Sequence, residues 1–448
     1  MSLVIRRVIF VVFLLIFFLI SPLVILYAAG YKFSKSGLNF QKTGMFILDS
    51  KPKGAKIYLN GKLQQTFLKK LLSSPDSFIT TPAKIKNLLP AEYNLTLAAA
   101  GYWPWQKKLK IESGASTYAE DIYLFKKELP ISLVSGEIKK IQLSPNKNLL
   151  ALLANQQLVL INLASQEQTF TPIFIAKTDQ FSWSPDSQWL LVNQQIFNSQ
   201  DLKQIINLKD FIKSQTVKYQ WLAGKLSYFD KDGINVFDPQ TTVSQQIIAT
   251  QKPIDFLIKD NYLYLIVASG QTVNLNIIKL DNRQLIRSIN LPGSTNYYFT
   301  SPQHQLVNIY DQDHQILYLI DPFFNAYSPL VEAINNLKQS YWLASQKLLY
   351  ANDFEIWLFD LASREKTILA RISNPIGSLL WHPSNNYLIY STDKTINILE
   401  LDQREKRNLI ELINFDQILS PVLNSNGDQL YFVAKIGNQE GLYKLAIQ

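Results

Sequence analysis

A serine and a carboxylate stand close together in the segment FSWSPDSQWLLV, residues 181–192. Ser184 and Asp186, separated by Pro185, raise the possibility of a reactive site with a serine nucleophile. An α/β-type serine hydrolase needs a nucleophile elbow, and the chain contains no GxSxG pattern. HExxH and P-loop patterns are also missing, and 16 glycines in 448 residues do not favour a glycine-rich phosphate site. These motifs therefore give no support for an enzyme.

Metal and thiol chemistry are also disfavoured. The chain has no cysteine, which excludes disulfides, thiolate catalysis and Cys-based zinc or iron–sulfur sites. The spacing of His304 and His314 matches no common zinc motif. Two fragments of a calcium-loop pattern are more typical of solvated turns: Asp311-Gln312-Asp313 and Asp230-Lys231-Asp232-Gly233. We predict no metal and no cofactor.

The Ser-Pro-Asp segment is one member of a repeat that fills residues 127–448. An apolar residue enters a short polar turn, and an apolar strand follows, at steps of roughly 37 to 43 residues. The matching positions are Leu143, Trp183, Trp221, Ile258, Phe299, Trp342, Trp381 and Leu423. This period predicts a β-propeller of about eight four-stranded blades, with seven as the alternative because repeats three, four and six lack the Ser-Pro step. We also expect an N-terminal strand to close the ring with the last blade.

Two of these turns carry a resemblance to known propellers. Ser184-Pro185-Asp186 before WLLV, and His382-Pro383-Ser384 before YLIY, resemble the repeats of TolB-like and WD-type families. The resemblance implies turn or packing roles, with Trp183 and Trp189 between blades. The turn and packing residues expected are Trp183, Ser184, Pro185, Asp186, Trp221, Trp342, Trp381, His382 and Pro383.

Aspartates recur at matching strand ends of this repeat. We expect them to form turns by accepting hydrogen bonds from nearby backbone amides. The alternative is glycosidase chemistry, which requires two acids that converge in the propeller channel. The recurring residues are Asp238, Asp281, Asp321, Asp360 and Asp402.

A second unit, residues 43–126, consists of short β-rich segments between Gly, Pro and Asn turns. The motifs Ser50 to Gly61 (SKPKGAKIYLNG), Thr81-Pro82-Ala83, Leu89-Pro90-Ala91-Glu92-Tyr93 and Gly101-Tyr102 resemble the PEGA domain family in type and order. The resemblance implies an accessory domain of the cell surface or envelope, for which carbohydrate binding is a common suggestion. Departures are Glu92, where glycine is usual, and a long link at 63–80 that contains Leu68-Lys69-Lys70-Leu71-Leu72, which suggests one helical turn. Candidate ligand-binding residues are Tyr102, Trp103 and Trp105, whose rings could stack on sugars if exposed; the alternative is packing on the sheet.

The N-terminus predicts a membrane anchor. Residues 8–31 contain no charge and, at 1.5 Å per residue, span the roughly 30 Å core of a bilayer. A cleaved signal peptide and a buried core helix are the alternatives. Arg6 and Arg7 favour a cytoplasmic tail at residues 1–7, whereas lysines in the linker at residues 32–42 weaken that bias. The net charge of +9 lies in the first third of the chain, and a near-neutral C-terminal part argues against nucleic-acid binding.

Together these observations predict an all-β protein with a single-pass anchor, a PEGA-like β-domain at 43–126 and a propeller at 127–448. We expect a non-catalytic, membrane-anchored bacterial envelope protein, mostly extracytoplasmic, that binds a protein or glycan through its propeller. The competing hypothesis is a propeller hydrolase or lyase that acts on envelope polysaccharide. A purely structural spacer is a third possibility. An acidic cluster in the channel would favour the enzyme, and a lining of aliphatic, Asn and Gln side chains would argue against it.

Overall fold

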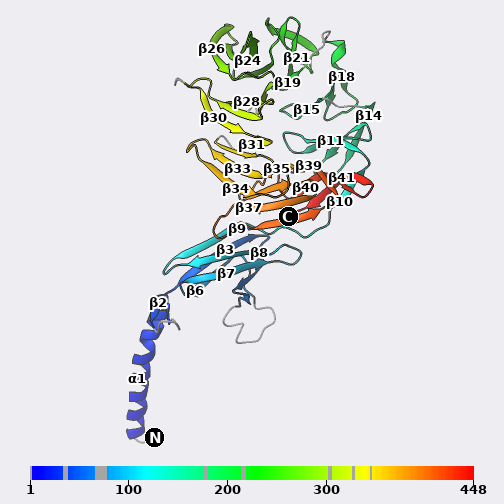
Figure 1. The fold of residues 1–448 in the computed structure, drawn as a ribbon. Coiled ribbons are helices and arrows are strands. Elements are labelled where there is room, and N and C mark those ends of the chain that lie inside the picture. Colours follow the sequence, from blue (N-terminus) through cyan, green and yellow to red (C-terminus); the bar gives the residue numbers. More distant parts are fainter. Residues whose placement is uncertain are drawn as a thin grey trace.

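In the part of the chain that the structure describes, the elements are β-strands apart from one long N-terminal helix and a short 3₁₀ turn (Figure 1). The computed structural model describes residues 3–33, 39–65, 78–175, 180–212, 218–300, 305–324, 328–343 and 346–448. Along the chain, the helix is followed by a small hairpin, a two-sheet unit and a ring of four-stranded sheets. His304 and the segment Leu68 to Leu72 lie outside the described residues.

The helix α1, Leu3–Ala28, is apolar on all sides and leaves its side chains exposed. Within it, Ile5–Ala28 contains an 18-residue window with a mean hydropathy of 3.3 and is long and apolar enough to cross a membrane. A helix suits that environment because it satisfies its backbone hydrogen bonds internally. The helix ends three residues before the predicted limit of residue 31, because Gly30 adopts a φ of 85° and Tyr31 begins a strand.

A two-stranded hairpin follows the helix directly. It consists of β1, Tyr31–Phe33, and β2, Phe40–Lys42, paired antiparallel. Thr43 closes its base, since both its backbone N–H and its hydroxyl donate to the carbonyl of Gly30 at 2.7 Å.

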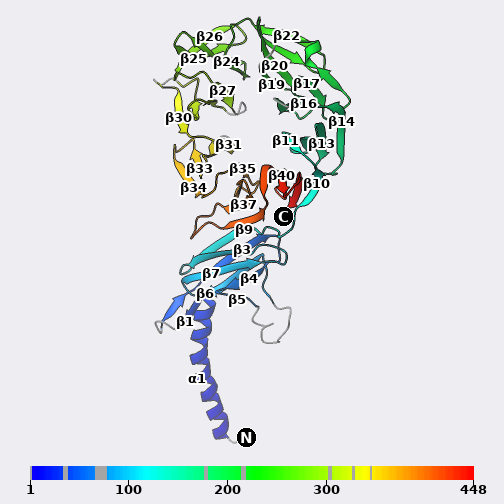
Figure 2. The ribbon, with the colours of Figure 1, turned by 45° about the vertical axis from the view of Figure 1, so that its right-hand side comes forward.

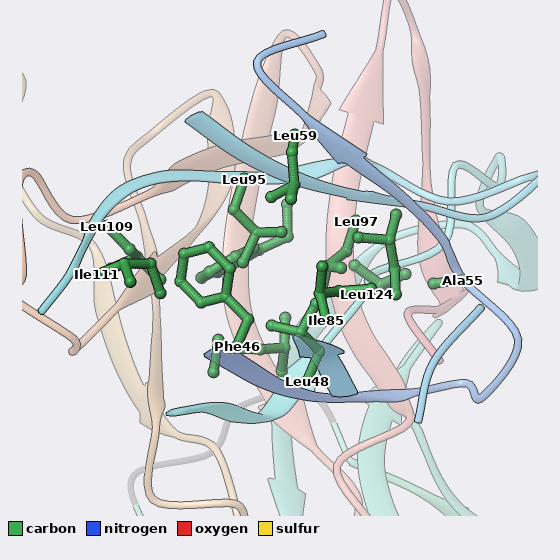
Figure 3. Packing of buried hydrophobic residues seen from close by; sticks show 14 residues of the cluster. Phe46, Leu48, Ala55, Leu59, Ile85, Leu95, Leu97, Leu109, Ile111 and Leu124 are labelled. Carbon is green, nitrogen blue, oxygen red and sulfur yellow. The ribbon is translucent and has the colours of Figure 1, made fainter. Parts of the chain in front are cut away.

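Two sheets between Gly44 and Tyr123 pack face to face and form what we call the small sandwich. Phe46, Leu95 and Ile111 come from different strands and point into one core, seen in Figure 3. In β8 every second residue is buried, as expected for a strand with one face on a core. The first sheet contains β6 (Ala83–Leu88), β3 (Gly44–Lys51) and β9 (Ser116–Tyr123), and the second contains β5 (Lys62–Leu63), β4 (Lys56–Leu59), β7 (Ala91–Ala98) and β8 (Trp105–Ile111).

Eight four-stranded antiparallel sheets then surround a centre, with the first strand of each inside and the last outside (Figure 2). Blade I has β11 (Ile138–Leu143), β12 (Leu149–Ala154), β13 (Gln157–Asn162) and β14 (Gln168–Phe174); blade II has β15 (Phe181–Trp183), β16 (Trp189–Val192), β17 (Gln195–Asn198) and β18 (Ile205–Asn207). The 3₁₀ turn η1, Leu208–Asp210, follows blade II. Blade III has β19 (Tyr219–Leu222), β20 (Lys225–Asp230), β21 (Gly233–Asp238) and β22 (Val243–Ile248); blade IV has β23 (Asp255–Lys259), β24 (Tyr262–Ser269), β25 (Thr272–Lys279) and β26 (Gln284–Leu291).

The second half of the ring repeats this plan. Blade V has β27 (Tyr297–Thr300), β28 (Val307–Asp311), β29 (Ile316–Ile320) and β30 (Leu330–Asn335); blade VI has β31 (Gln339–Leu343), β32 (Lys347–Ala351), β33 (Glu355–Asp360) and β34 (Lys366–Arg371). Blade VII has β35 (Ser378–Trp381), β36 (Tyr387–Ser391), β37 (Thr395–Glu400) and β38 (Leu409–Asn414); blade VIII has β39 (Gln417–Leu423), β40 (Gln429–Ile436), β41 (Gln439–Ala446) and β10 (Ile131–Ser135). The predicted fold class and the count of eight blades are confirmed.

Neighbouring blades cover each other's apolar faces. One cluster joins Ala151 and Leu153 of blade I to Leu190 and Phe197 of blade II. This arrangement explains how strands such as β12 and β16, which are buried along almost their whole length, can occur in consecutive sheets.

The ring closes through the two ends of the propeller sequence. Strand β10 pairs antiparallel with β41, as Ile131 opposite Lys444 and Ser135 opposite Gly441. The Glu440 carboxylate also accepts from the backbone N–H of Ile138, 302 residues away. The expected closing strand is therefore present, as the outer strand of blade VIII.

Substituting Gly441 should weaken this closure. A Cβ at Gly441 would lie 2.5 Å from the carbonyl oxygen of Val134, so Gly441→Ala must push β10 away. We expect the free energy of unfolding to fall by about 1–3 kcal/mol, measured by denaturant titration. Gly293→Ala is the control, because nothing lies within 4 Å of its Cβ position. Equal stability of the two variants would contradict the closure.

Candidate functional site

Ser184 lies in the tight turn between β15 and β16. Its buried hydroxyl donates to Asp186 Oδ1 at 2.5 Å and accepts from the backbone N–H of Trp189 at 2.9 Å. Ser187, three residues further on, takes a φ of 63° and donates its N–H to the Ser184 carbonyl. The serine and carboxylate are thus hydrogen-bonded to each other and to the turn backbone, and Pro185 is exposed at its tip.

The same turn recurs in three other blades. Ser144, His382 and Asn424 occupy the position of Ser184, and each donates its N–H to the carbonyl five residues later. The residue three places after each has a positive φ, in Lys147, Asn385 and Gly427 as in Ser187. Pro383 is exposed in its turn as Pro185 is. The buried polar side chain at the first position therefore organises a turn.

Blades III and IV use a shorter turn. Ala223-Gly224 and Asp260-Asn261 both have positive φ at two consecutive residues, which is the two-residue hairpin connection that matches strand twist. These repeats lack the Ser-Pro step because their connection is too short to contain it.

The tryptophans of the repeat link blades or line a cavity. Trp183 is buried and donates Nε1–H to the Gln142 carbonyl of blade I, while Trp221 donates to the Ser182 carbonyl of blade II at 3.1 Å. Trp342 and Trp381 are half-buried on blades VI and VII and face the cavity described below. The Trp381 indole also donates to Asn385.

His382 is buried between rings from two parts of the chain. The rings of Tyr123 and Phe125, just after the small sandwich, lie edge-on to it at 5.2 and 5.9 Å, and Tyr387 at 6.0 Å. Its Nε2 lies 3.1 Å from the Gly427 carbonyl, which can only accept, so Nε2 carries the proton. Burial is the main cause that lowers the pKa of His382 to about 4, and the charge of Lys51 adds to it.

Four of the five recurring aspartates also hold turns, whereas Asp281 lies 3.9 Å from Lys279 Nζ. Asp238, Asp321, Asp360 and Asp402 each accept a backbone N–H two residues later, at 2.9 to 3.1 Å. In the calcium-like fragments, Asp230 accepts from Asp232 and Gly233 within its own turn.

Asp311 and Asp313, the other calcium-like fragment, share the hydroxyl of Ser294. In the part of the chain that the structure describes, no group of three or more His, Cys, Asp or Glu residues is placed to hold a metal.

The candidate sugar-binding segment at Tyr102 packs against two parts of the chain. Trp105 is only 4% exposed and belongs to the core of the small sandwich, which corresponds to the alternative of packing on the sheet. Tyr102 packs against the same core, and Trp103 packs against blades VII and VIII with Lys127 over its ring. These rings belong to a junction between the small sandwich and the propeller.

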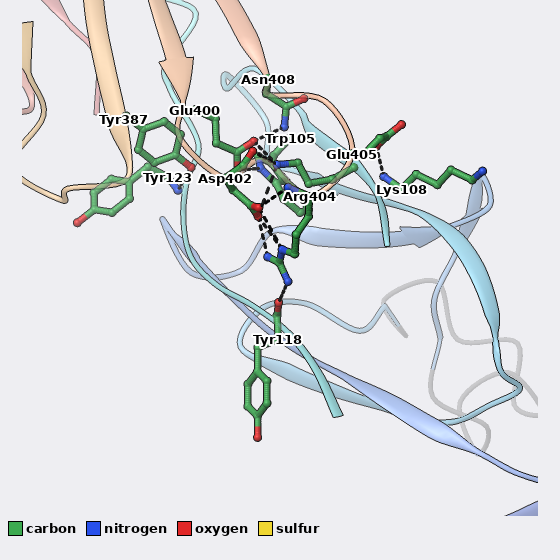
Figure 4. A network of polar contacts seen from close by, with 11 residues as sticks. Trp105, Lys108, Tyr118, Tyr123, Tyr387, Glu400, Asp402, Arg404, Glu405 and Asn408 are labelled. Carbon is green, nitrogen blue, oxygen red and sulfur yellow. Dashed lines mark hydrogen bonds and ion pairs between the residues drawn. The ribbon is translucent and has the colours of Figure 1, made fainter. Parts of the chain in front are cut away.

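A buried ion pair lies at this junction (Figure 4). Lys107 Nζ, from β8, is 2.9 Å from Glu400 Oε2 at the end of β37, and their side chains are 0% and 2% exposed. Glu400 also accepts from Trp105 Nε1 and from Asn408 at 2.8 Å, and Lys107 donates to the Asp402 carbonyl at 2.8 Å. Every polar atom of the pair thus has a partner, as a buried charge requires.

Asp402 and Arg404 extend the junction towards the surface. Burial alone would raise the pKa of Asp402, but hydrogen bonds from Arg404 outweigh burial and hold that pKa below its usual value. Arg404 in turn donates to the Tyr118 carbonyl of the small sandwich at 2.7 Å. Sequence reasoning missed this site, although one signal existed. Lys107 occupies one of the alternate positions of β8 whose other side chains are apolar and buried.

A cavity with a volume of about 930 Å³ lies against the inner strands of blades VI, VII, VIII and I. Its walls include aliphatic residues such as Leu143 and Leu423, the rings of Tyr341, Trp342 and Trp381, and two lysines, Lys147 and Lys347. The cavity can therefore receive a ligand with apolar or aromatic groups and an anionic group.

The lining of this cavity, as far as the structure describes it, contains no Asp or Glu. The buried carboxyl with a raised pKa is that of Asp255, on the inner strand of blade IV, where burial is the main cause. It bonds to Lys218 and to the backbone N–H groups of Phe256 and Phe299, and so links blades IV and V. The described cavity thus lacks the carboxylate pair of a glycosidase.

Comparison with known proteins supports the fold. The Dos1 propeller overlays with a TM-score of 0.50 at 12% identity, covering 72% of this chain and 96% of that one. Two other solved structures overlay less closely. A eukaryotic initiation factor has a TM-score of 0.46 at 12% identity, covering 67% of this chain and 82% of that one. The Cps50 (Swd1) propeller of Myceliophteria thermophila has a TM-score of 0.40 at 12% identity, covering 72% of this chain and 100% of that one. No family model and no curated protein matches the chain. The chain thus has the β-propeller fold.

Breaking the buried ion pair on one side should be costly. Lys107→Met leaves the Glu400 carboxylate buried without its charge partner, so the free energy of unfolding should fall by about 3–5 kcal/mol. Lys107→Met combined with Glu400→Gln removes both charges and keeps an acceptor for Trp105, so it should lose much less. Lys108→Met is the neighbouring control, because Lys108 and its partner Glu92 are both about half exposed. Equal loss in all three variants, measured by denaturant titration, would refute a specific buried pair.

His382 should make stability depend on pH. Its pKa is about 4 in the folded chain and 6.5 when exposed, so between these values the unfolded chain binds a proton that the folded chain does not. This contribution to stability is therefore complete above pH 6.5 and declines as pH falls to 4, by about 3 kcal/mol. His382→Asn should remove this decline, since Asn424 fills the same position in blade VIII. Identical pH dependence of unfolding in both proteins would show that His382 does not titrate in this way.

Proposed function

We propose that this protein is a non-catalytic scaffold that is anchored in a membrane by α1 and binds a protein partner through its propeller. The cavity of about 930 Å³ against four inner strands carries this proposal. Ligand sites are typically concave and largely apolar, with a few polar groups that fix orientation. The ring of Tyr341 and the lysines Lys147 and Lys347 provide that combination.

The contacts that hold the propeller to the small sandwich, and the sandwich to α1, also support a scaffold. The Lys107–Glu400 pair and the Arg404 contact tie the small sandwich to blade VII, and the backbone N–H of Lys126 donates to the Ile447 carbonyl of blade VIII at 3.0 Å. At the other end, Tyr27 of α1 accepts from Asn87 of β6 at 3.1 Å. Contacts at both ends of the sandwich favour a propeller held at a set position above the bilayer.

We further propose that residues 43–126 are a PEGA-like domain and residues 127–448 the propeller, with 32–42 as linker and 1–7 as tail. The support is the order of PEGA-like motifs together with the seven strands that these residues form. Arg6 and Arg7, before the uncharged run of α1, favour a cytoplasmic tail, and hence a propeller outside the cytoplasm of a bacterial cell, facing an envelope protein or glycan. A polysaccharide hydrolase has less support, because the described cavity lining lacks acids.

Capture of the partner from membranes can test the cavity. Full-length protein purified in mild detergent should retain a partner that is reduced several-fold by Tyr341→Ala or Lys147→Glu, both of which alter the cavity wall. Tyr118→Ala is the matched control, because Tyr118 is similarly exposed but lies on the small sandwich. A partner that all three variants retain equally would argue against the cavity. A captured species that survives protease digestion would identify a glycan in place of a protein.

A further inference from the structure

The hairpin β1–β2 presents an exposed aromatic pair, Phe33 and Phe40, at the end away from its base. Its cross-strand pairs place Tyr31 opposite Lys42 and Phe33 opposite Phe40, so these four side chains share one face. All four are exposed, and the two phenylalanine rings meet edge-to-face at 5.7 Å. An isolated two-stranded hairpin is marginally stable in water, so a face of this kind needs a surface to pack against.

The opposite face of the hairpin is turned towards the small sandwich. It carries Lys32 and Gln41, and Lys32 Nζ reaches the Asn87 carbonyl of β6. The same Asn87 donates to Tyr27 near the end of α1. Lys42, at the base of the hairpin, also reaches the sandwich, since a Cβ at Gly114 would lie 3.2 Å from its side chain. The hairpin is therefore held to the sandwich at its base, and the phenylalanine pair is exposed near its other end.

The position of the hairpin is set by the helix. Ile5–Ala28 spans about 36 Å, slightly more than the roughly 30 Å hydrocarbon core of a bilayer. Only Ala29 and Gly30 separate the helix from β1, so Tyr31 cannot lie more than about 11 Å from the helix end at Ala28. Figure 2 shows β1 beside the upper end of α1, where the helix meets the sandwich. A helix that crosses a bilayer would place this hairpin at the level of the lipid headgroups.

We propose that the hairpin face formed by Tyr31, Phe33, Phe40 and Lys42 binds the membrane interface and takes an anionic phospholipid. The rings enter the boundary between headgroups and acyl chains, where aromatic side chains are favoured, and Lys42 pairs with the headgroup phosphate. This inference rests on the proposed membrane anchor. It adds a second contact with the lipid, which restricts the tilt of the whole protein.

The absence of cysteine makes the test direct. Single variants Phe33→Cys and Phe40→Cys of the full chain carry a spin label in phosphatidylcholine nanodiscs, with or without phosphatidylglycerol. We expect collisions with oxygen, which concentrates in lipid, to exceed collisions with a water-soluble nickel chelate several-fold at both positions. Gln41→Cys, on the opposite face of the same hairpin, and Leu129→Cys, beyond the sandwich, should show the reverse. Phosphatidylglycerol should move the label at position 33 deeper into the bilayer, and Lys42→Gln should remove that effect.

Two other results would overturn the proposal. Equal accessibility at positions 33 and 41 would show that the face does not enter lipid. Spin–spin broadening at position 33 that disappears on dilution with unlabelled chain would assign the face to a second copy of the protein. Leu19→Cys, in the middle of α1, distinguishes failure of the hairpin contact from failure of the anchor. A label at position 19 that lipid protects, together with a water-exposed label at position 33, refutes only the hairpin contact. Water-exposed labels at both positions refute the hairpin contact and the anchor.

Discussion

The pairing of β10 with β41 is the interaction on which the rest of the structure depends. Each blade has two apolar faces, and a row of such sheets is soluble only if every face is covered. Closure supplies the outer strand of blade VIII, and blades VIII and I then share the core that contains Leu150, Leu152, Tyr431 and Leu442. Because β10 follows the small sandwich within a few residues, closing the ring also brings the sandwich against blades VII and VIII.

Buried charge then fixes the angle between the two units. An apolar contact tolerates small rotations, whereas a buried lysine must keep its carboxylate partner and its remaining acceptors. Lys107 meets Glu400 and the Asp402 carbonyl together, so few orientations of the sandwich satisfy it. The cavity shares Leu380 and Leu423 with the apolar cluster at this junction but none of its charged residues, which leaves the rings and lysines of the cavity available to a ligand.

Sequence reasoning was accurate where the determinants are local. The turn at Ser184 recurs as Ser144, His382 and Asn424 because each side chain bonds to backbone within five residues, and such units leave a visible period. The junction was not predictable in the same way. Trp105 and Glu400 are 295 residues apart, and an aromatic motif beside a turn looks the same whether its rings are exposed or buried. Only Lys107, a charged residue at one of the alternate buried positions of β8, indicated that a distant partner was needed.

Closure across the whole propeller sequence also has a consequence for synthesis. Strand β10 leaves the ribosome soon after the sandwich, but its partner β41 follows only after seven blades have been made. During that interval β10 presents an unpaired edge, and the face of blade I that later packs on blade VIII is uncovered. With α1 inserted in a membrane as proposed, the incomplete chain would be held at the bilayer surface in this state. Translation speed over blades II to VIII therefore sets how long each molecule can exchange its closing strand with a neighbour.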